Sequence, residues 1–167
     1  MKCPASIIED TNTIHEMLGN NIKFIQSRFG IIKINLDKTI LFPTGLPGII
    51  DKKFCLAHLP NKKFEPFKVL QSIENEKLAF IVYPLDNLEL IDHNDIIACS
   101  KLLSIEIENM VICLITSIYY NSNSTTPKIT VNLRAPIIID LHKYLAVQHI
   151  FSHEKYNIQH ELLFTPN

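Results

Sequence analysis

The 167-residue sequence has no tryptophan, only four glycines and almost no net charge, since 16 basic residues face 17 acidic ones. A formal net charge of −1 gives no excess of basic groups for contacts with nucleic-acid phosphates. Direct binding of RNA or DNA is therefore not expected. Long apolar runs are missing too: residues 110–115 form one of the longest, far below the roughly 20 residues that cross a bilayer. No membrane-spanning segment is predicted.

Paired cysteines and a signal peptide are also missing. The four cysteines, Cys3, Cys55, Cys99 and Cys113, include no C-x-x-C pair, and no apolar segment of useful length follows Met1. These features predict reduced, mostly buried thiols in a soluble cytoplasmic protein.

Motifs for catalysis or metal binding are lacking as well. Neither a Gly-x-Ser-x-Gly segment nor a Cys/His/Asn pattern is present, so we do not expect an enzyme or a bound cofactor. His149 and His153 would share one face of a helix, but their segment has the pattern of strand and tail. In a strand, residues four apart lie ~13 Å from each other at ~3.3 Å per residue. No carboxylate or cysteine is placed to complete a shell with His160, so no metal site is predicted.

What the sequence does contain is a series of short strands. The composition, 47% hydrophobic and 20% charged, is that of one globular domain. β-branched and aromatic residues predict a hairpin over residues 22–35, turning at Phe29-Gly30, and strands over 53–59, 67–73, 78–83, 109–120 and 144–150. A parallel sheet needs a crossover of a dozen or more residues for each strand pair, and this chain has room for about one. The predicted fold is therefore all-β, a small antiparallel β-barrel or sandwich.

The main predicted helix covers residues 92–103. Asp92 is placed to cap it, and Asp95 suits the positive end of its dipole. Ile96, Ile97 and Leu103 would form its apolar stripe.

The best-patterned strand covers residues 130–135, where apolar and polar residues alternate, which predicts one face in the core and one in water. Pro136 then removes a ladder donor, so an edge, a bulge or a bend is expected there. Residues 137–139 are all isoleucine, which suggests a strand covered on both faces.

A second distinctive segment is the loop over residues 42–48, in which Pro43, Gly45, Pro47 and Gly48 impose a fixed, non-repetitive path. It has neither the Lys-Ser/Thr pair nor the helix start of a phosphate-binding loop. We expect a structural loop whose Leu46 packs onto the open end of the barrel.

The two ends of the chain are predicted to be appendages. Residues 1–22 form an N-terminal extension, in which Thr13 and Glu16 fit a capping box and Gly19 would end a helix of two turns. The chain after residue 150 is expected to be loose, and residues 163–167 form a C-terminal tail.

Several of these segments, in this order and spacing, resemble the flagellar assembly factor family FliW. They are Phe42-Pro43-Thr44-Gly45-Leu46-Pro47-Gly48, Leu70-Gln71-Ser72 with Leu78-Ala79-Phe80, and Val131-Asn132-Leu133-Arg134-Ala135-Pro136-Ile137. The resemblance covers residues 23–162 and implies a small antiparallel β-barrel domain. The chain departs from the family at Ile49, where an aromatic residue is usual, and at Gln159-His160, where an Arg-His pair is common.

The resemblance also implies a function: a cytoplasmic, non-enzymatic protein, here expected to be a monomer, that binds flagellin. Such a protein also binds the RNA-binding translational regulator CsrA and relieves its repression. Asn132, Arg134, Leu46 and Tyr83 are our candidate partner-binding residues. Asn132 and Arg134 have a structural interpretation too, in which Arg134 bridges to a neighbouring strand or loop carbonyl and Asn132 joins parts of the barrel; we favour that interpretation.

Two other classes of function remain open. A small-molecule-binding or enzymatic β-barrel would hold its ligand in the mouth of the barrel, but the sequence offers no convergent set of polar residues. A direct RNA binder would expose aromatic residues among Lys and Arg, whereas the phenylalanines here occupy strand positions expected to be buried.

Overall fold

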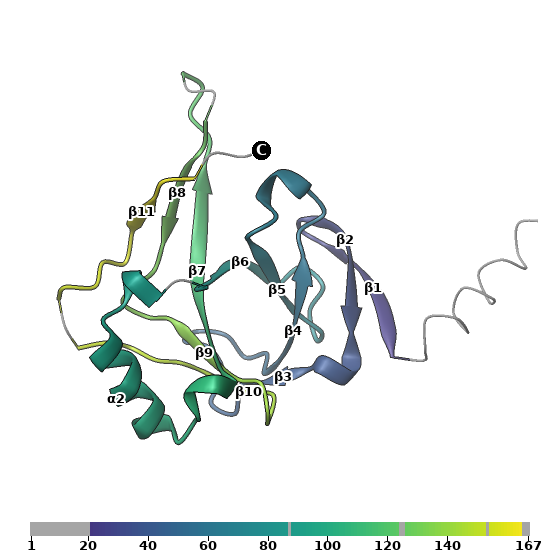
Figure 1. The fold of residues 1–167 in the computed structure, drawn as a ribbon. Coiled ribbons are helices and arrows are strands. Elements are labelled where there is room, and N and C mark those ends of the chain that lie inside the picture. The colour runs from purple at the N-terminus through teal and green to yellow at the C-terminus, as the bar shows by residue number, and fades with distance from the viewer. Residues whose placement is uncertain (1–20, 87, 124–125, 153, 165–167) are drawn as a thin grey trace, which may run out of the picture.

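The computed structural model describes residues 21–86, 88–123, 126–152 and 154–164, and it is mainly β with one α-helix (Figure 1). The strands are β1 (Ile22–Ser27), β2 (Gly30–Asn35), β3 (Ile40–Leu41), β4 (Lys53–His58), β5 (Lys68–Ser72), β6 (Ala79–Pro84), β7 (Met110–Tyr119), β8 (Lys128–Val131), β9 (Ile137–Asp140), β10 (Leu145–Gln148) and β11 (His160–Leu162). The helix is α2 (His93–Leu103), and short 3-10 turns cover Leu36–Lys38, Lys62–Phe64, Leu88–Leu90 and Ile107–Asn109. The helix predicted near residues 13–19, with nearly all of the predicted extension, lies outside the described residues.

The sheet closes on itself through β7. The strand order is β11-β8-β7-β6-β5-β4-β3-β10-β9, and β9 pairs with β7 in addition, which makes a ring. Different parts of β7 serve three neighbours: Met110 to Cys113 pair with β9, Cys113 to Ile115 with β6, and Thr116 to Tyr119 with β8. The closure agrees with the predicted barrel. The pairing is antiparallel throughout the described ladders except between β10 and β3, which run parallel with Leu145 opposite Leu41.

The predicted strand over residues 130–135 is wrong beyond Val131. The side chain of Asn132 accepts a hydrogen bond from the backbone N–H of Ala135 (3.0 Å), which closes a turn and ends β8. On the expected polar face, Thr130 is buried, while Asn132 and Arg134 are half-buried. The predicted bend before Pro136 is confirmed, and β9 after it is buried at every position.

The chain after residue 150 is less loose than expected. β11 pairs with β8, with His160 opposite Val131 and Leu162 opposite Ile129. Three residues are too few to show a strand period in the sequence, so β11 depends on the neighbouring strand for its formation.

The helix forms as predicted. The Asp92 side chain accepts from the backbone N–H of Asn94 (2.9 Å) and so caps α2. Ile96 is buried while Ile97 and Leu103 are half-buried, and Cys99 completes the buried stripe. The helix ends at Ser104, which adopts the left-handed conformation with a φ of 54°.

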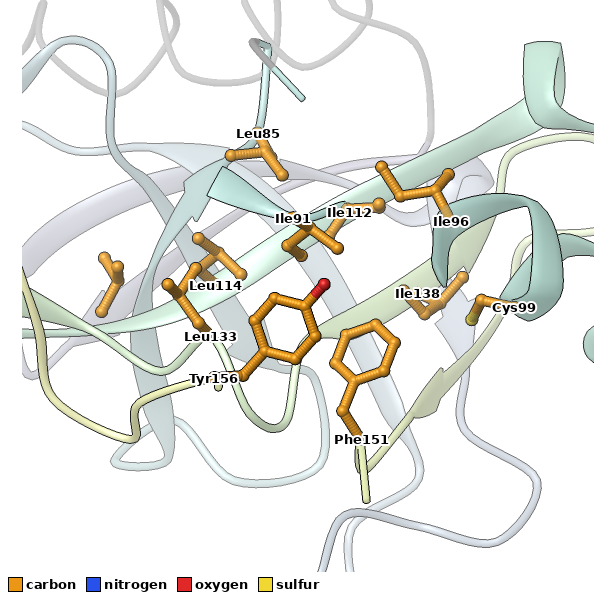
Figure 2. Close-up of a cluster of buried hydrophobic side chains, with 11 residues drawn as sticks. Leu85, Ile91, Ile96, Cys99, Ile112, Leu114, Leu133, Ile138, Phe151 and Tyr156 are labelled. Atoms are coloured by element: carbon orange, nitrogen blue, oxygen red, sulfur yellow. The ribbon is translucent and has the colours of Figure 1, made fainter. Parts of the chain in front are cut away.

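The buried side chains form separate clusters. Under the helix, the rings of Phe151 and Tyr156 lie with centroids 4.7 Å apart beside Ile91 and Leu133 (Figure 2). Inside the ring of strands, Phe42 and Phe54 meet edge to face at 5.2 Å. A third cluster joins the β1–β2 hairpin to β4 and β5. Phe24 is an exception to the prediction of buried phenylalanines, since 53% of it is exposed.

The three cysteines in the described residues are free and buried, as predicted; Cys3 lies outside that part of the chain. Burial raises the pKa of the thiols of Cys55 and Cys99, and it raises the pKa of Cys113 to about 12. Among the described residues, no helix is long and apolar enough to cross a membrane.

Candidate functional site

The loop after β3 consists of two consecutive turns. The backbone N–H of Gly45 donates to the carbonyl of Phe42 (2.9 Å), and the N–H of Ile49 donates to that of Leu46 (2.9 Å). Gly45 and Gly48 have φ values of 71° and 76°, which side chains with a Cβ rarely adopt. Both glycines therefore occupy backbone conformations that a residue with a Cβ would adopt only under strain.

Leu46 fastens this loop to the interior. Its side chain is 5% exposed and packs in the cluster of Phe42 and Phe54, as the prediction of a loop packed on the barrel requires. At this exposure Leu46 offers little surface to a partner, whereas Pro47 is exposed and Ile50 is 93% exposed. The outer surface of the loop is therefore built by its other residues.

A shallow groove of about 590 Å³ runs along the loop, lined by residues 44–50 and Gln148; we call it the loop groove. The side-chain amide of Gln148 donates to the carbonyl of Ala135 (3.0 Å), within the bend that follows β8. Gln148 thus lies between the loop and the segment that contains Asn132 and Arg134. No pattern in the sequence points to Gln148, because its place depends on the register that sets it opposite Ile137.

Asn132 and Arg134 have different surroundings within the bend. Asn132 has a structural role, since its side chain closes the turn to Ala135 and its backbone N–H donates to the carbonyl of Ile115 (2.9 Å). Arg134 uses its carbonyl to accept from Phe151 (2.9 Å). In the part of the chain that the structure describes, the Arg134 guanidinium has no hydrogen bond or ion pair, so the bridge considered for it is not formed there.

Tyr83 lies elsewhere, on β6. Its ring is 5.4 Å from that of Phe67, and it packs half-buried against two clusters. The structure therefore brings Leu46, Asn132 and Arg134 to the surroundings of Gln148 and leaves Tyr83 apart from them.

Gln71 and Ser72, in another of the family-like segments, have structural roles. The amide nitrogen of Gln71, which is fully buried, lies within 3.2 Å of four carbonyl oxygens in and next to the β5–β6 turn. The hydroxyl of Ser72 donates to Asp51 (2.6 Å) and accepts from the backbone N–H groups of Glu74 and Asn75. These residues fix the turn between two strands of the ring.

Several ionisable groups among the described residues have pKa values shifted by their surroundings. No three metal-binding side chains gather within the described residues, and His153 is not among them. Burial lowers the pKa of His149, whose ring lies 4.9 Å from that of Phe151. Burial would raise the pKa of Asp140, but hydrogen bonds from the backbone N–H groups of Lys143 and His142 outweigh it and hold that pKa below its usual value. Asp140 borders an apolar cavity of about 200 Å³ lined also by Pro43, Leu103 and Ile138.

Known proteins resemble this chain over nearly the whole described region. Residues 23–162 match the family described as FliW protein. A flagellar assembly factor FliW from Clostridium beijerinckii is 37% identical over 147 residues, covering 85% of this chain and 99% of the relative. One from Oceanobacillus iheyensis is 31% identical over 147 residues, covering 84% and 93%. A crystal structure of the flagellar assembly factor FliW superposes with a TM-score of 0.61 at 25% identity, covering 83% of this chain and 96% of that one. The chain therefore belongs to the FliW family.

Proposed function

We propose that this protein is a cytoplasmic, non-enzymatic binding module for flagellin and for the translational regulator CsrA. The observation that carries the proposal is membership of the FliW family over residues 23–162. Bound to flagellin, the protein would be unavailable to CsrA; when flagellin leaves the cell, it would become free to bind CsrA and relieve repression. Such a switch works only if the two partners compete or are negatively coupled.

We place the partner contacts at the loop groove and the adjoining bend. The support is that Arg134 is half-buried with its guanidinium unpaired within the described residues, and that Pro47 and Ile50 are exposed along the loop groove. Gln148 joins the two parts, since it lines the groove and bonds Ala135, the residue after Arg134. Arginine and apolar residues together are a common composition for the centre of a protein interface. Asn132 and Leu46 then act as scaffold for that surface.

A pull-down from native lysate with the tagged chain tests partner identity, and titration calorimetry with purified flagellin tests the direct contact. We expect binding that needs no metal or nucleotide. Absence of heat at tens of micromolar flagellin would count heavily against the proposal.

The variant Arg134→Glu tests the placement. It should weaken partner binding and leave the melting temperature within about 1 °C, because the side chain has no partner in the described residues. Lys77→Glu, an exposed cation in the β5–β6 turn, is the matched control. Equal effects of the two variants would show a general charge effect and reject the placement.

A small-molecule-binding or enzymatic β-barrel remains the alternative. The apolar cavity beside Asp140, about 200 Å³, is smaller than the roughly 300–1,000 Å³ of most ligand pockets. The carboxylate at its rim already accepts two backbone hydrogen bonds and pairs with Lys143 (3.5 Å). A saturable small-molecule ligand that protects the chain from thermal unfolding would favour this alternative.

A further inference from the structure

The β1–β2 hairpin is a two-stranded sheet of its own, outside the ring. One face is buried: Ile25, Ile32 and Ile34 are at most 2% exposed and pack on residues of β4, β5 and β6. The opposite face carries Phe24 and Ile31, which are 53% and 66% exposed. Figure 1 shows β1 as the outermost strand at this flank of the described chain, with β2 between it and β4.

The exposed side chains on this face are neighbours. Phe24 lies opposite Lys33, and Gln26 lies opposite Ile31, so Phe24 and Ile31 are diagonal partners on the same face. Single exposed apolar residues are ordinary on protein surfaces, but two adjacent ones on the same sheet face form a small apolar surface. We call Phe24, Gln26, Ile31 and Lys33 the hairpin face.

The hairpin is also positively charged. Between Ile22 and Asn35 the chain has Lys23, Arg28 and Lys33 but no carboxylate, although the whole protein carries a net charge of −1. None of the three cations forms an ion pair with the described residues. The charge complement to this surface is therefore acidic.

The outer edge of β1 presents unpaired main-chain groups. The backbone N–H of Leu36 donates to the carbonyl of Asn21 (2.7 Å), and bonded and non-bonded pairs alternate along an antiparallel ladder. Lys23 and Ile25 therefore direct their N–H and C=O groups to β2, while Ile22, Phe24 and Gln26 direct theirs away from it. Within the described residues no strand pairs with that edge.

We propose that the β1 edge and the hairpin face together bind an extended, acidic segment of a partner protein by strand addition. Its backbone pairs with Ile22, Phe24 and Gln26, and an apolar side chain packs beside Phe24 on the face that also carries Ile31. Its carboxylates project from the opposite face, where they meet Lys23, and Lys33 adds positive charge nearby. Main-chain pairing supplies affinity in this mode, and alternate side chains supply selectivity. This site is separate from the loop groove and does not depend on the flagellin proposal.

The chemistry favours a polypeptide over a membrane or a nucleic acid. Clusters that bind anionic lipids usually have four to eight basic residues, and this hairpin has three. Donors and acceptors that alternate at the spacing of a strand match another strand, whereas phosphates supply acceptors only. An interface of this size is expected to be weak and transient.

The test uses the full chain, isotope-labelled for nuclear magnetic resonance, and a capped octapeptide that alternates valine and glutamate. We expect the backbone amide signals of Ile22, Phe24 and Gln26 to shift with saturation, and hydrogen exchange at these amides to slow. Affinity should fall as salt is added, because the ion pairs are exposed. Two control peptides should bind at least tenfold more weakly than the glutamate peptide. One has lysine in place of each glutamate, and the other has proline in place of one of the two inner valines.

Protein variants test the residues. Lys23→Glu with Lys33→Glu should weaken binding of the glutamate peptide by about tenfold, since two attractive charges, one of them in contact with the peptide, become repulsive. Phe24→Ser should weaken it as well. Two variants serve as controls: Lys62→Glu with Lys63→Glu, at exposed lysines of another element, and Leu102→Ser, at an exposed apolar position. Their affinity for the glutamate peptide should stay within twofold of that of the unchanged chain. The amide spectrum away from the hairpin reports whether each variant keeps its fold.

Several outcomes would overturn the proposal. One is the absence of any shift at millimolar peptide; another is a shift at the lysines without one at the three outward amides. Equal weakening by the control variants would also reject the site. If phosphatidylserine vesicles or a single-stranded RNA octamer caused stronger shifts than the peptide, the ligand of this site would be a lipid or a nucleic acid and not a polypeptide. A flagellin pull-down that fails while the peptide binds would leave this site standing and reject only the proposed function.

Discussion

At the scale of single residues, Gly48 shows how backbone geometry explains a family-like position. Its φ of 76° strains any residue with a Cβ, and a Cβ built there meets nothing within 4 Å, so conformation alone sets the cost. We expect Gly48→Ala to destabilise the protein by roughly 1 kcal/mol, a fall in melting temperature of about 2–4 °C. It should weaken both proposed partner interactions together, because it disturbs a scaffold.

The matched change Thr44→Ala, at an exposed position of the same loop, should alter little. Gly45→Ala should cost more than Gly48→Ala, since its Cβ would lie 3.1 Å from the Ile49 carbonyl. Circular dichroism melting curves decide between these expectations. A Gly48→Ala variant that keeps its melting temperature and loses one partner only would make the loop a contact surface.

Gln71 is a second residue whose role lies in hydrogen bonding. Its amide nitrogen serves carbonyls of the β5–β6 turn, and the side chain is fully buried. Gln71→Leu should destabilise the chain by about 1–3 kcal/mol, because carbonyls in and next to the turn, one of them buried, lose their donor. Chemical denaturation measures the change, and Gln159→Leu, at an exposed glutamine, is the control. Equal stability of the two variants would mean that water or a relaxed turn replaces the amide.

At the scale of elements, the sequence predicts the ends of helices and the turns of hairpins where residues close together in the chain determine them. Asp92 caps α2, and the hairpin turns at Arg28 and Phe29, one residue before the predicted turn, with Gly30 (φ 105°) as the first residue of β2. The same reasoning fails over residues 130–135, where alternation indicates a strand but the Asn132 side chain closes a turn instead. Alternation of apolar and polar residues indicates which face of a strand is buried. It does not show whether a side chain will bind a backbone N–H that the strand pairing would otherwise use.

The contact between α2 and the C-terminal segment is an element-scale feature that responds to pH. The Tyr156 hydroxyl donates to Asp95 (2.5 Å) and accepts from the backbone N–H of Asp92 (3.0 Å). Lys155 pairs with Asp95 (2.8 Å) and lies 5.0 Å from the centre of the Tyr156 ring. Burial, and then the bond to Asp95, raise the pKa of Tyr156; the bond to Asp95 chiefly raises that of Lys155.

A pKa raised on folding stabilises the protein fully below the unfolded value, about 10 for tyrosine, and the contribution disappears as pH rises through the folded value. Tyr156→Phe should therefore lower stability by about 1–2 kcal/mol at pH 7. The difference from the unchanged chain should narrow above about pH 10. Thermal melts from pH 7 to 11 measure it, with Tyr120→Phe, at a 75% exposed tyrosine, as control. A difference that is constant across this range would show that the phenol proton has no part in the contact.

At the scale of the whole molecule, β7 closes the sheet by pairing with β6, β8 and β9. The sequence indicates β7 as a strand because of its β-branched residues, yet nothing local shows that Met110 faces Asp140 or that Leu145 runs parallel to Leu41. These pairings depend on packing between distant segments. For the same reason the sequence does not predict the loop groove, which requires Gln148 to lie beside residues 44–50.

The proposed switch is a property of the whole molecule as well, because one domain would serve two partners. If flagellin and CsrA compete or are negatively coupled, each must weaken the other's binding by the same factor, since linkage is reciprocal for binding free energies. We expect calorimetric titration of flagellin into this protein to give lower affinity when CsrA is present at saturation. The reverse titration should show the same ratio. Titration of flagellin into CsrA without this protein controls for direct contact between them. Identical flagellin affinities with and without CsrA would mean that the two partners bind independently, and release of flagellin could not then free this protein for CsrA.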